Sequence, residues 1–90
     1  MLKKHSPVIG QIVISKVGRD QGQVYLVVGT SGDVKWLLAD GRKKTVDHPK
    51  VKNPRHLKIL HFVAEGIAES GKINDLTIRA ALAKLSPDKL

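Results

Sequence analysis

The chain has 90 residues, of which 41% are hydrophobic and only three are aromatic, so one small domain with an aliphatic core is expected. It contains no cysteine, which excludes disulfide frameworks, thiolate zinc sites and catalysis by a thiol. Sixteen Lys and Arg against eight Asp and Glu give a net charge of +8. Residues 1–58 carry this whole excess, because residues 59–90 hold four basic and four acidic side chains. A basic segment joined to a neutral one indicates a surface that meets a polyanion.

The first sixty residues alternate short apolar runs with turn residues, a pattern typical of antiparallel strands. Five runs rich in β-branched and aliphatic residues predict strands at residues 10–17, 24–30, 34–40, 42–46 and 56–60. Asp40-Gly41 is a dipeptide favoured in type I′ turns, so it predicts a tight hairpin between the third and fourth strands. Residues 47–55 contain two prolines and no periodicity, which predicts a loop. Five short strands without an intervening helix favour a closed barrel, since closure removes exposed edges.

Helical spacing replaces strand alternation after Leu60. A first helix is predicted to end near Gly71, and Asn74 suits the N-cap of a second helix. We therefore expect a β-barrel at residues 1–60 and a two-helix C-terminal extension at residues 61–90 that packs on or beside it. The extension would cap the barrel or, because it is neutral, offer a surface to a protein partner.

The turn between the first two strands is more charged than a simple reversal requires. Gly22 can adopt a positive φ, which would keep the loop tight and let a nucleic-acid backbone approach. Arg19 offers a planar guanidinium that suits a phosphate or the edge of a guanine, and Lys16 stands beside it at the strand end. Gly18 and Gly22 also satisfy plain hairpin geometry, whether or not anything binds.

The second basic cluster follows Asp40-Gly41. Strand alternation would place Arg42 and Lys44 on one face and Lys43 on the other. These side chains would either contact phosphates or, as a solvated edge, discourage association of the sheet with other chains.

The segment GQIVISKVGRDQGQVYLVV resembles a KOW motif, the β-loop-β element of several ribosomal proteins and NusG-type transcription factors. WLLADGRKKTV resembles the second hairpin of small KOW-domain RNA-binding proteins related to an archaeal and eukaryotic large-subunit ribosomal protein, and PRHLKIL resembles their closing strand. IAESGKINDLTIRAALAKL is similar to the helical extension of bacterial members. The resemblance covers nearly all of residues 9–85. It implies a mainly β fold, a small SH3-like five-stranded β-barrel of KOW type with a short C-terminal helical appendage, which binds structured RNA on the ribosome.

The predicted RNA contacts are the polar, basic and glycine residues of three loops: Lys16, Arg19, Gln21, Gly22, Gln23, Arg42, Lys43, Lys44, Lys50, Lys52 and Arg55. The family usually places consecutive basic residues before the closing strand, whereas the last three residues of this set are spaced apart. We therefore predict a ribosome-associated protein that contacts ribosomal RNA, with a ribosomal or translation protein as a second partner, bound by the helices. The alternative is an SH3-like module that binds an acidic protein in transcription or translation, because the same charge would attract it.

Other function classes find no support in the sequence. The serines lack a recognisable nucleophile setting, and the glycines form neither a GxGxxG nor a Walker motif, so no catalysis and no cofactor are expected. His56 and His61 are five residues apart, which is no recognised ligand spacing, so no metal is expected. Trp36 is expected in the barrel core or against the helices. No apolar run approaches the roughly 18 residues of a membrane span, and no secretory signal is present, which predicts a soluble cytoplasmic protein without a membrane partner.

Overall fold

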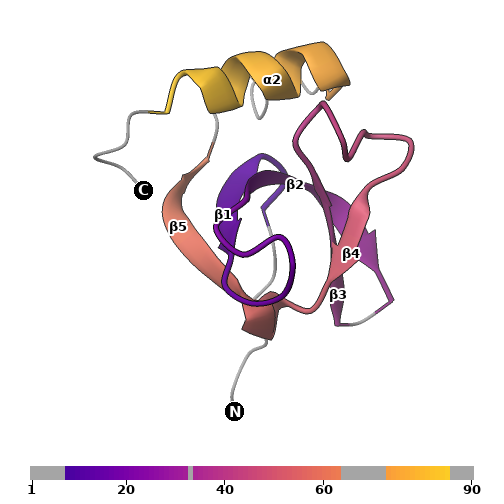
Figure 1. Ribbon diagram of the computed structural model, residues 1–90. Helices are drawn as coiled ribbons and strands as arrows, with labels where there is room; N and C mark the ends of the chain where they lie inside the picture. Colours follow the sequence, from indigo (N-terminus) through magenta and orange to yellow (C-terminus); the bar gives the residue numbers. More distant parts are fainter. Residues whose placement is uncertain (1–7, 33, 64–72, 86–90) are drawn as a thin grey trace.

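The computed structural model describes residues 8–32, 34–63 and 73–85. Its elements in chain order are β1 (Gln11–Ser15), β2 (Val24–Ser31), β3 (Lys35–Ala39), β4 (Lys50–Lys52), the 3₁₀ helix η1 (Pro54–His56), β5 (Leu57–Val63) and α2 (Asp75–Ala83). The strands form one antiparallel sheet in the order β4-β3-β2-β1-β5, and α2 lies across one end of the curled sheet (Figure 1). The predicted mainly β fold with a C-terminal helix is confirmed.

The sheet is bent by two irregularities in its pairing. The register of β2 with β3 shifts between Val27 and Gly29, and that of β1 with β5 shifts between Gln11 and Val13. A bulge of this kind bends a strand and increases its twist. Within the described residues, β4 and β5 are the two edge strands of the sheet. Closure of the sheet into a barrel therefore remains a prediction.

Both faces of the sheet are buried, because neighbouring residues of one strand enter different cores. On the face toward α2, Ile12 and Leu26 pack with Ile78 of the helix, and all three are fully buried. On the other face, Trp36 packs in a cluster whose buried members are Val13, Tyr25, Val27, Trp36, Leu38 and Leu57. Trp36 is therefore a residue of the sheet core and not of the contact with the helix.

The predicted strand at residues 42–46 is wrong, because this segment forms bends and not a strand. The fourth strand is β4, which lies within the predicted loop and pairs with β3 at Trp36↔Lys52. The predicted type I′ turn also fails. Both of its central residues need positive φ, whereas glycines alone adopt positive φ in the described ranges, so Asp40 does not.

The C-terminal part differs from the prediction at its start. β5 continues to Val63, where it pairs with Gln11, so residues 61–63 are strand and not the beginning of a helix. The remainder of that predicted helix, residues 64–72, lies outside the described residues. The predicted N-cap of the second helix is confirmed, since the Asn74 side chain accepts the Thr77 N–H at 2.8 Å and the Thr77 hydroxyl accepts the Asn74 N–H at 3.1 Å. Over the part of the chain that the structure describes, no helix has the length and apolar character needed to cross a membrane.

Candidate nucleic-acid interface

The loop at residues 16–23 joins β1 to β2 as a tightly hydrogen-bonded turn. Gly18 and Gly22 have φ values of 92° and 91°, in the region that favours glycine. The Gly22 N–H donates to the Ser15 carbonyl at 2.8 Å. A Cβ added at Gly22 would meet nothing within 4 Å, so glycine is required here for backbone conformation and not for space.

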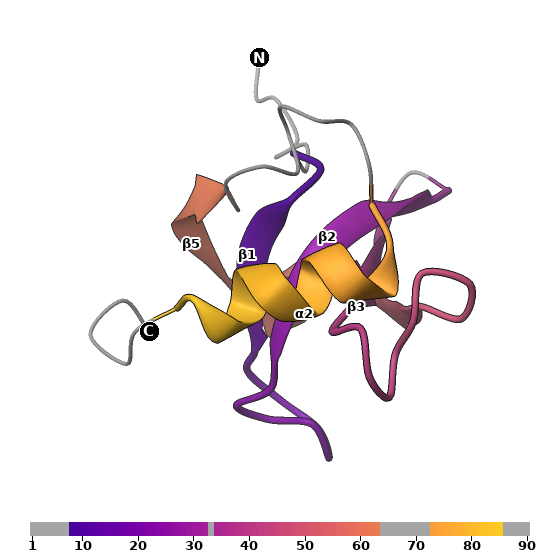
Figure 2. The same ribbon diagram turned by 90° about the horizontal axis from the view of Figure 1, so that it is seen from above.

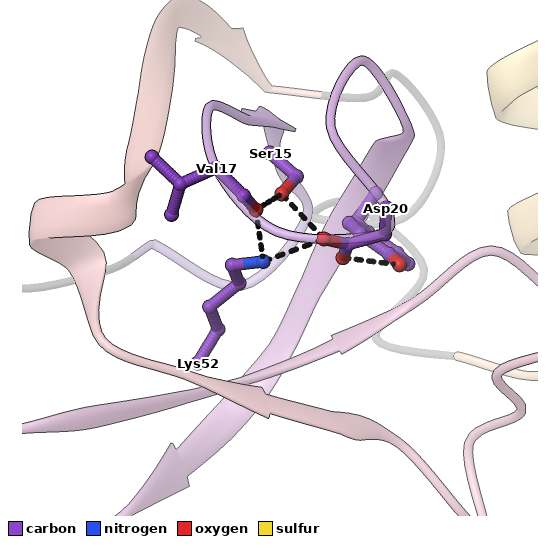
Figure 3. Close-up of polar contacts among 5 residues, drawn as sticks. Ser15, Val17, Asp20 and Lys52 are labelled. Atoms are coloured by element: carbon purple, nitrogen blue, oxygen red, sulfur yellow. Dashed lines mark hydrogen bonds and ion pairs between the residues drawn. The ribbon is translucent and has the colours of Figure 1, made fainter.

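The half-buried carboxylate of Asp20 anchors this loop (Figure 3). Its Oδ1 accepts hydrogen bonds from Ser15 Oγ at 2.8 Å and from Lys52 Nζ at 2.6 Å, and its Oδ2 accepts one from the Tyr25 hydroxyl at 2.8 Å. Lys52 Nζ also donates to the Val17 carbonyl at 3.0 Å. The Lys52 and Asp20 side chains are 10% and 16% exposed. The loop is thus fastened both to its flanking strands and to β4.

The protonation states of this cluster follow from the same contacts. Burial favours a raised pKa for Asp20, but hydrogen bonds from Lys52, Ser15 and Tyr25 outweigh it and hold the pKa well below its ordinary value. Burial, and next the hydrogen bond to Asp20, raises the pKa of Tyr25 above its ordinary value. Asp20 is therefore charged and Tyr25 neutral across the whole neutral range, and the cluster persists there.

The same loop exposes the polar residues that the sequence singled out. In this loop, the exposed residues of the predicted set are Lys16, Arg19, Gln21, Gly22 and Gln23. The backbone N–H of Lys16 donates to the His56 carbonyl at 2.8 Å, which ties the start of the loop to η1. The loop backbone is fixed while its polar side chains face solvent, which lowers the entropy cost of binding.

A second loop, residues 40–49, joins β3 to β4 and is shaped by Asp40. Asp40 Oδ1 accepts the backbone N–H of Arg42 at 2.9 Å and that of Lys44 at 3.0 Å. The Asp40 N–H donates in return to the Lys44 carbonyl at 2.9 Å. Arg42 and Lys43 are exposed and Lys44 is half-buried, so the strand-like alternation predicted for these three residues does not apply.

Helix α2 holds this second loop in place. Arg79 Nη1 donates to the Gly41 carbonyl at 2.7 Å, and Asp75 Oδ1 accepts the Val46 N–H at 2.9 Å. Gly41 has a φ of 80°, and a Cβ there would lie 2.6 Å from the Asp75 carbonyl oxygen. The helix therefore packs directly on the glycine. The sequence predicts Gly41 as a turn residue and does not indicate this contact.

The third predicted group of contacts is dispersed. Lys50 is half-buried in β4, and Arg55 is exposed in η1, where its backbone N–H is capped by the Asn53 side chain at 2.9 Å. Lys52 is occupied by Asp20 and by the Val17 carbonyl, so it shapes the first loop from within the protein.

The first two loops form one surface. Gln23 Nε2 donates to Asp40 Oδ2 at 3.3 Å and so bridges them. Gly22, Gln23 and Arg42 line a common depression with α2. Seen from above, the first loop, in purple, projects beyond one side of α2, and the second loop, in magenta, lies near the start of the helix (Figure 2). Two basic segments about twenty residues apart in sequence are thus brought together.

The acidic side chains near this surface form hydrogen bonds within the protein. Asp20, Asp40 and Asp75 each accept hydrogen bonds from groups of the same loops and strands. In the ranges 8–32, 34–63 and 73–85, no three His, Cys, Asp or Glu side chains gather as a metal site would need. The arrangement supplies exposed cations and amides on hydrogen-bonded loops, and these are the groups that bind phosphates and base edges.

Comparison with known proteins gives a relative that aligns with most of this chain. No protein-family model matches the chain. The Bacillus subtilis (strain 168) protein named "Putative ribosome-binding protein YbzG" is 34% identical over 71 residues, which cover 74% of this chain and 96% of the relative. The chain belongs to the family of this relative.

Proposed function

We propose that this protein binds the ribosome and contacts structured ribosomal RNA through its two basic loops. The observation that carries the proposal is the exposure of Arg19, Arg42 and Lys43 on loops whose backbones are fixed by Asp20 and Asp40. The name of the Bacillus subtilis relative, which describes ribosome binding, supports the same partner. Ribosome binding would place the protein in the cytoplasm.

The chemistry of the exposed groups suits an RNA backbone. Guanidinium groups bind phosphate oxygens in a bidentate manner, and a lysine ammonium adds a point charge. A-form RNA is recognised largely by shape and by its backbone, so cations on two fixed loops would match a particular arrangement of phosphates. We place Lys16, Arg19, Gln21, Gly22, Gln23, Arg42 and Lys43 at the centre of the contact, with Lys44, Lys50 and Arg55 at its margin. Lys52 is assigned instead to the support of the first loop.

We further propose that the sheet belongs to the SH3-like KOW type. Its support is the curled antiparallel sheet of five short strands with a charged β1–β2 loop between two positive-φ glycines. In this proposal the protein acts by binding, without catalysis, metal or cofactor.

Co-sedimentation with purified ribosomes tests the proposal. The protein should pellet with ribosomes, and an excess of deproteinised ribosomal RNA should release it into the supernatant. An acidic protein partner on the ribosome would predict the opposite, because free RNA would leave that contact largely in place. Release by RNA supports the RNA interface, and retention under saturating RNA would favour the protein-binding alternative.

A further inference from the structure

The two loops and α2 border an open depression that phosphate binding does not explain. Its volume is about 380 Å³, at the small end of the range for ligand pockets. Residues from all three segments line it, among them Gln23, Val24, Asp40, Arg42, Arg79 and Leu82. The lining therefore combines apolar side chains with two guanidinium groups, one amide and one carboxylate.

The carboxylate of Asp40 determines which kind of ligand group fits this depression. Asp40 is 9% exposed, and its Oδ1 is occupied by two backbone N–H groups. Among the described residues, Oδ2 meets the Gln23 amide alone, at the long distance of 3.3 Å, so it retains capacity to accept. A phosphate would find two guanidinium groups here but would be repelled by Asp40. A neutral group that both donates and accepts hydrogen bonds fits the charges better.

We propose that the depression holds one unstacked RNA base and that its donor and acceptor groups select guanine. This inference rests on the proposed binding of RNA. Bases splayed out of single-stranded RNA stack on guanidinium planes and are read along their edges. Guanine presents two adjacent donors, N1–H and the N2 amino group, which can both approach the Oδ2 atom of Asp40. Its O6 and N7 accept from a guanidinium such as that of Arg42. Arg79, whose Nη1 is fixed by the Gly41 carbonyl, and Leu82 would supply the stacking surface.

The other bases fit this set of groups less well. Adenine and cytosine would each set a ring-nitrogen lone pair against the Asp40 carboxylate, next to a single amino group. Uracil offers one donor between two carbonyl oxygens. Each alternative leaves a buried acceptor facing another acceptor, and a lost bidentate base contact typically reduces affinity about tenfold or more.

A nuclear magnetic resonance titration of the labelled protein with RNA pentamers tests this selection. The pentamers UUGUU, UUAUU, UUCUU and UUIUU differ in the central base alone, and inosine lacks the N2 amino group. We expect UUGUU to bind at least about tenfold more tightly than UUAUU or UUCUU, with UUIUU between them. The amides of Gly22 and Ala83, which border the depression, should shift on binding. Equal affinities for all four pentamers, or the absence of saturable shifts at these amides, would overturn the inference.

Variants separate the pocket from the remainder of the interface. Asp40→Asn keeps an oxygen for the two backbone N–H groups but places an amide donor against the donors of guanine. The preference for UUGUU over the other pentamers should therefore disappear. Asp47→Asn is the matched control, because Asp47 is exposed in the same loop and should keep the preference. The pentamer comparison on the wild-type protein stands even where Asp40→Asn fails to fold. Ribosome co-sedimentation run in parallel distinguishes the two proposals: binding to ribosomes without base preference refutes the pocket alone, while base preference without ribosome binding refutes the proposed function alone.

Discussion

Replacing Lys52 with methionine removes the ammonium that clamps the β1–β2 loop while keeping an unbranched apolar stem in its place. Lys52 and Asp20 are 10% and 16% exposed, so the lost contact is a mostly buried ion pair. Removing one partner of such a pair costs about 3–5 kcal/mol. Asp20 would keep its hydrogen bonds from Ser15 and Tyr25, so we expect the lower end, about 3 kcal/mol. A domain of this size is stable by roughly 5–15 kcal/mol, so the loss is a large fraction of the total.

Chemical and thermal unfolding measure this loss directly. About 3 kcal/mol corresponds to a drop in Tm on the order of 12–24 °C for a domain of fewer than 100 residues. The matched control is Lys35→Met, since Lys35 is exposed on β3 and the same substitution there should change stability by about 0.5 kcal/mol or less. A double variant with Asp20→Asn should lose less than the sum of the two single changes, because each change already breaks the same pair. Equal stabilities of Lys52→Met and Lys35→Met would refute the role given to this ion pair.

Other consequences follow from the same contacts. Gly22→Ala should cost about 1–2 kcal/mol through its positive φ alone, whereas Gly41→Ala should cost more in the same unfolding assay, since its Cβ also meets the backbone of α2; equal costs would contradict the packing role of Gly41. Asp20 has a lowered pKa in the folded state, so its contribution to stability should be complete above its ordinary pKa of 3.8 and be lost as the pH falls below it. Tyr25 has a raised pKa, so its contribution should be complete below pH 10.0 and be lost above it; a pH series of unfolding curves without a decline on either side would count against the cluster. Arg79→Ala should weaken ribosome co-sedimentation by releasing the β3–β4 loop, and Arg79→Lys should restore part of it.

The sequence pattern predicted the elements whose structure depends on residues close together in the chain. In the β-branched runs of β1 and β2, successive side chains point to opposite faces of the sheet, and both faces are buried. Asn74 caps its helix through hydrogen bonds with Thr77, three residues later. The prediction failed after Asp40, where the side chain competes with strand pairing by accepting backbone N–H groups of the following residues. β4 was missed because its lysine-rich segment becomes a strand through pairing with Trp36 and its neighbours.

In the candidate site, too, the sequence did not predict contacts between residues far apart in the chain. Exposure of Arg19 and Arg42 agrees with the composition of their loops, but the sequence does not indicate that Lys52 is withdrawn from solvent. Its partner Asp20 lies 32 residues earlier, and a charge count treats all lysines alike. The contact between Gly41 and α2 spans 38 residues for the same reason, so a glycine suited to a turn gave no sign that a helix packs on it.

The salt dependence of binding to deproteinised ribosomal RNA tests the central claim most directly, when measured for three variants with the same change in charge. Arg19→Glu and Arg42→Glu alter the two exposed loops, while Lys35→Glu alters an exposed strand position at the far end of β3. Each lost phosphate contact reduces the slope of log K against log salt by about 0.7–0.9. We expect each loop variant to bind more weakly with a slope flatter by about one unit, and Lys35→Glu to keep nearly the wild-type slope. Identical slopes for all three variants would contradict the account, because they would mean that the loops contribute net charge and no contact.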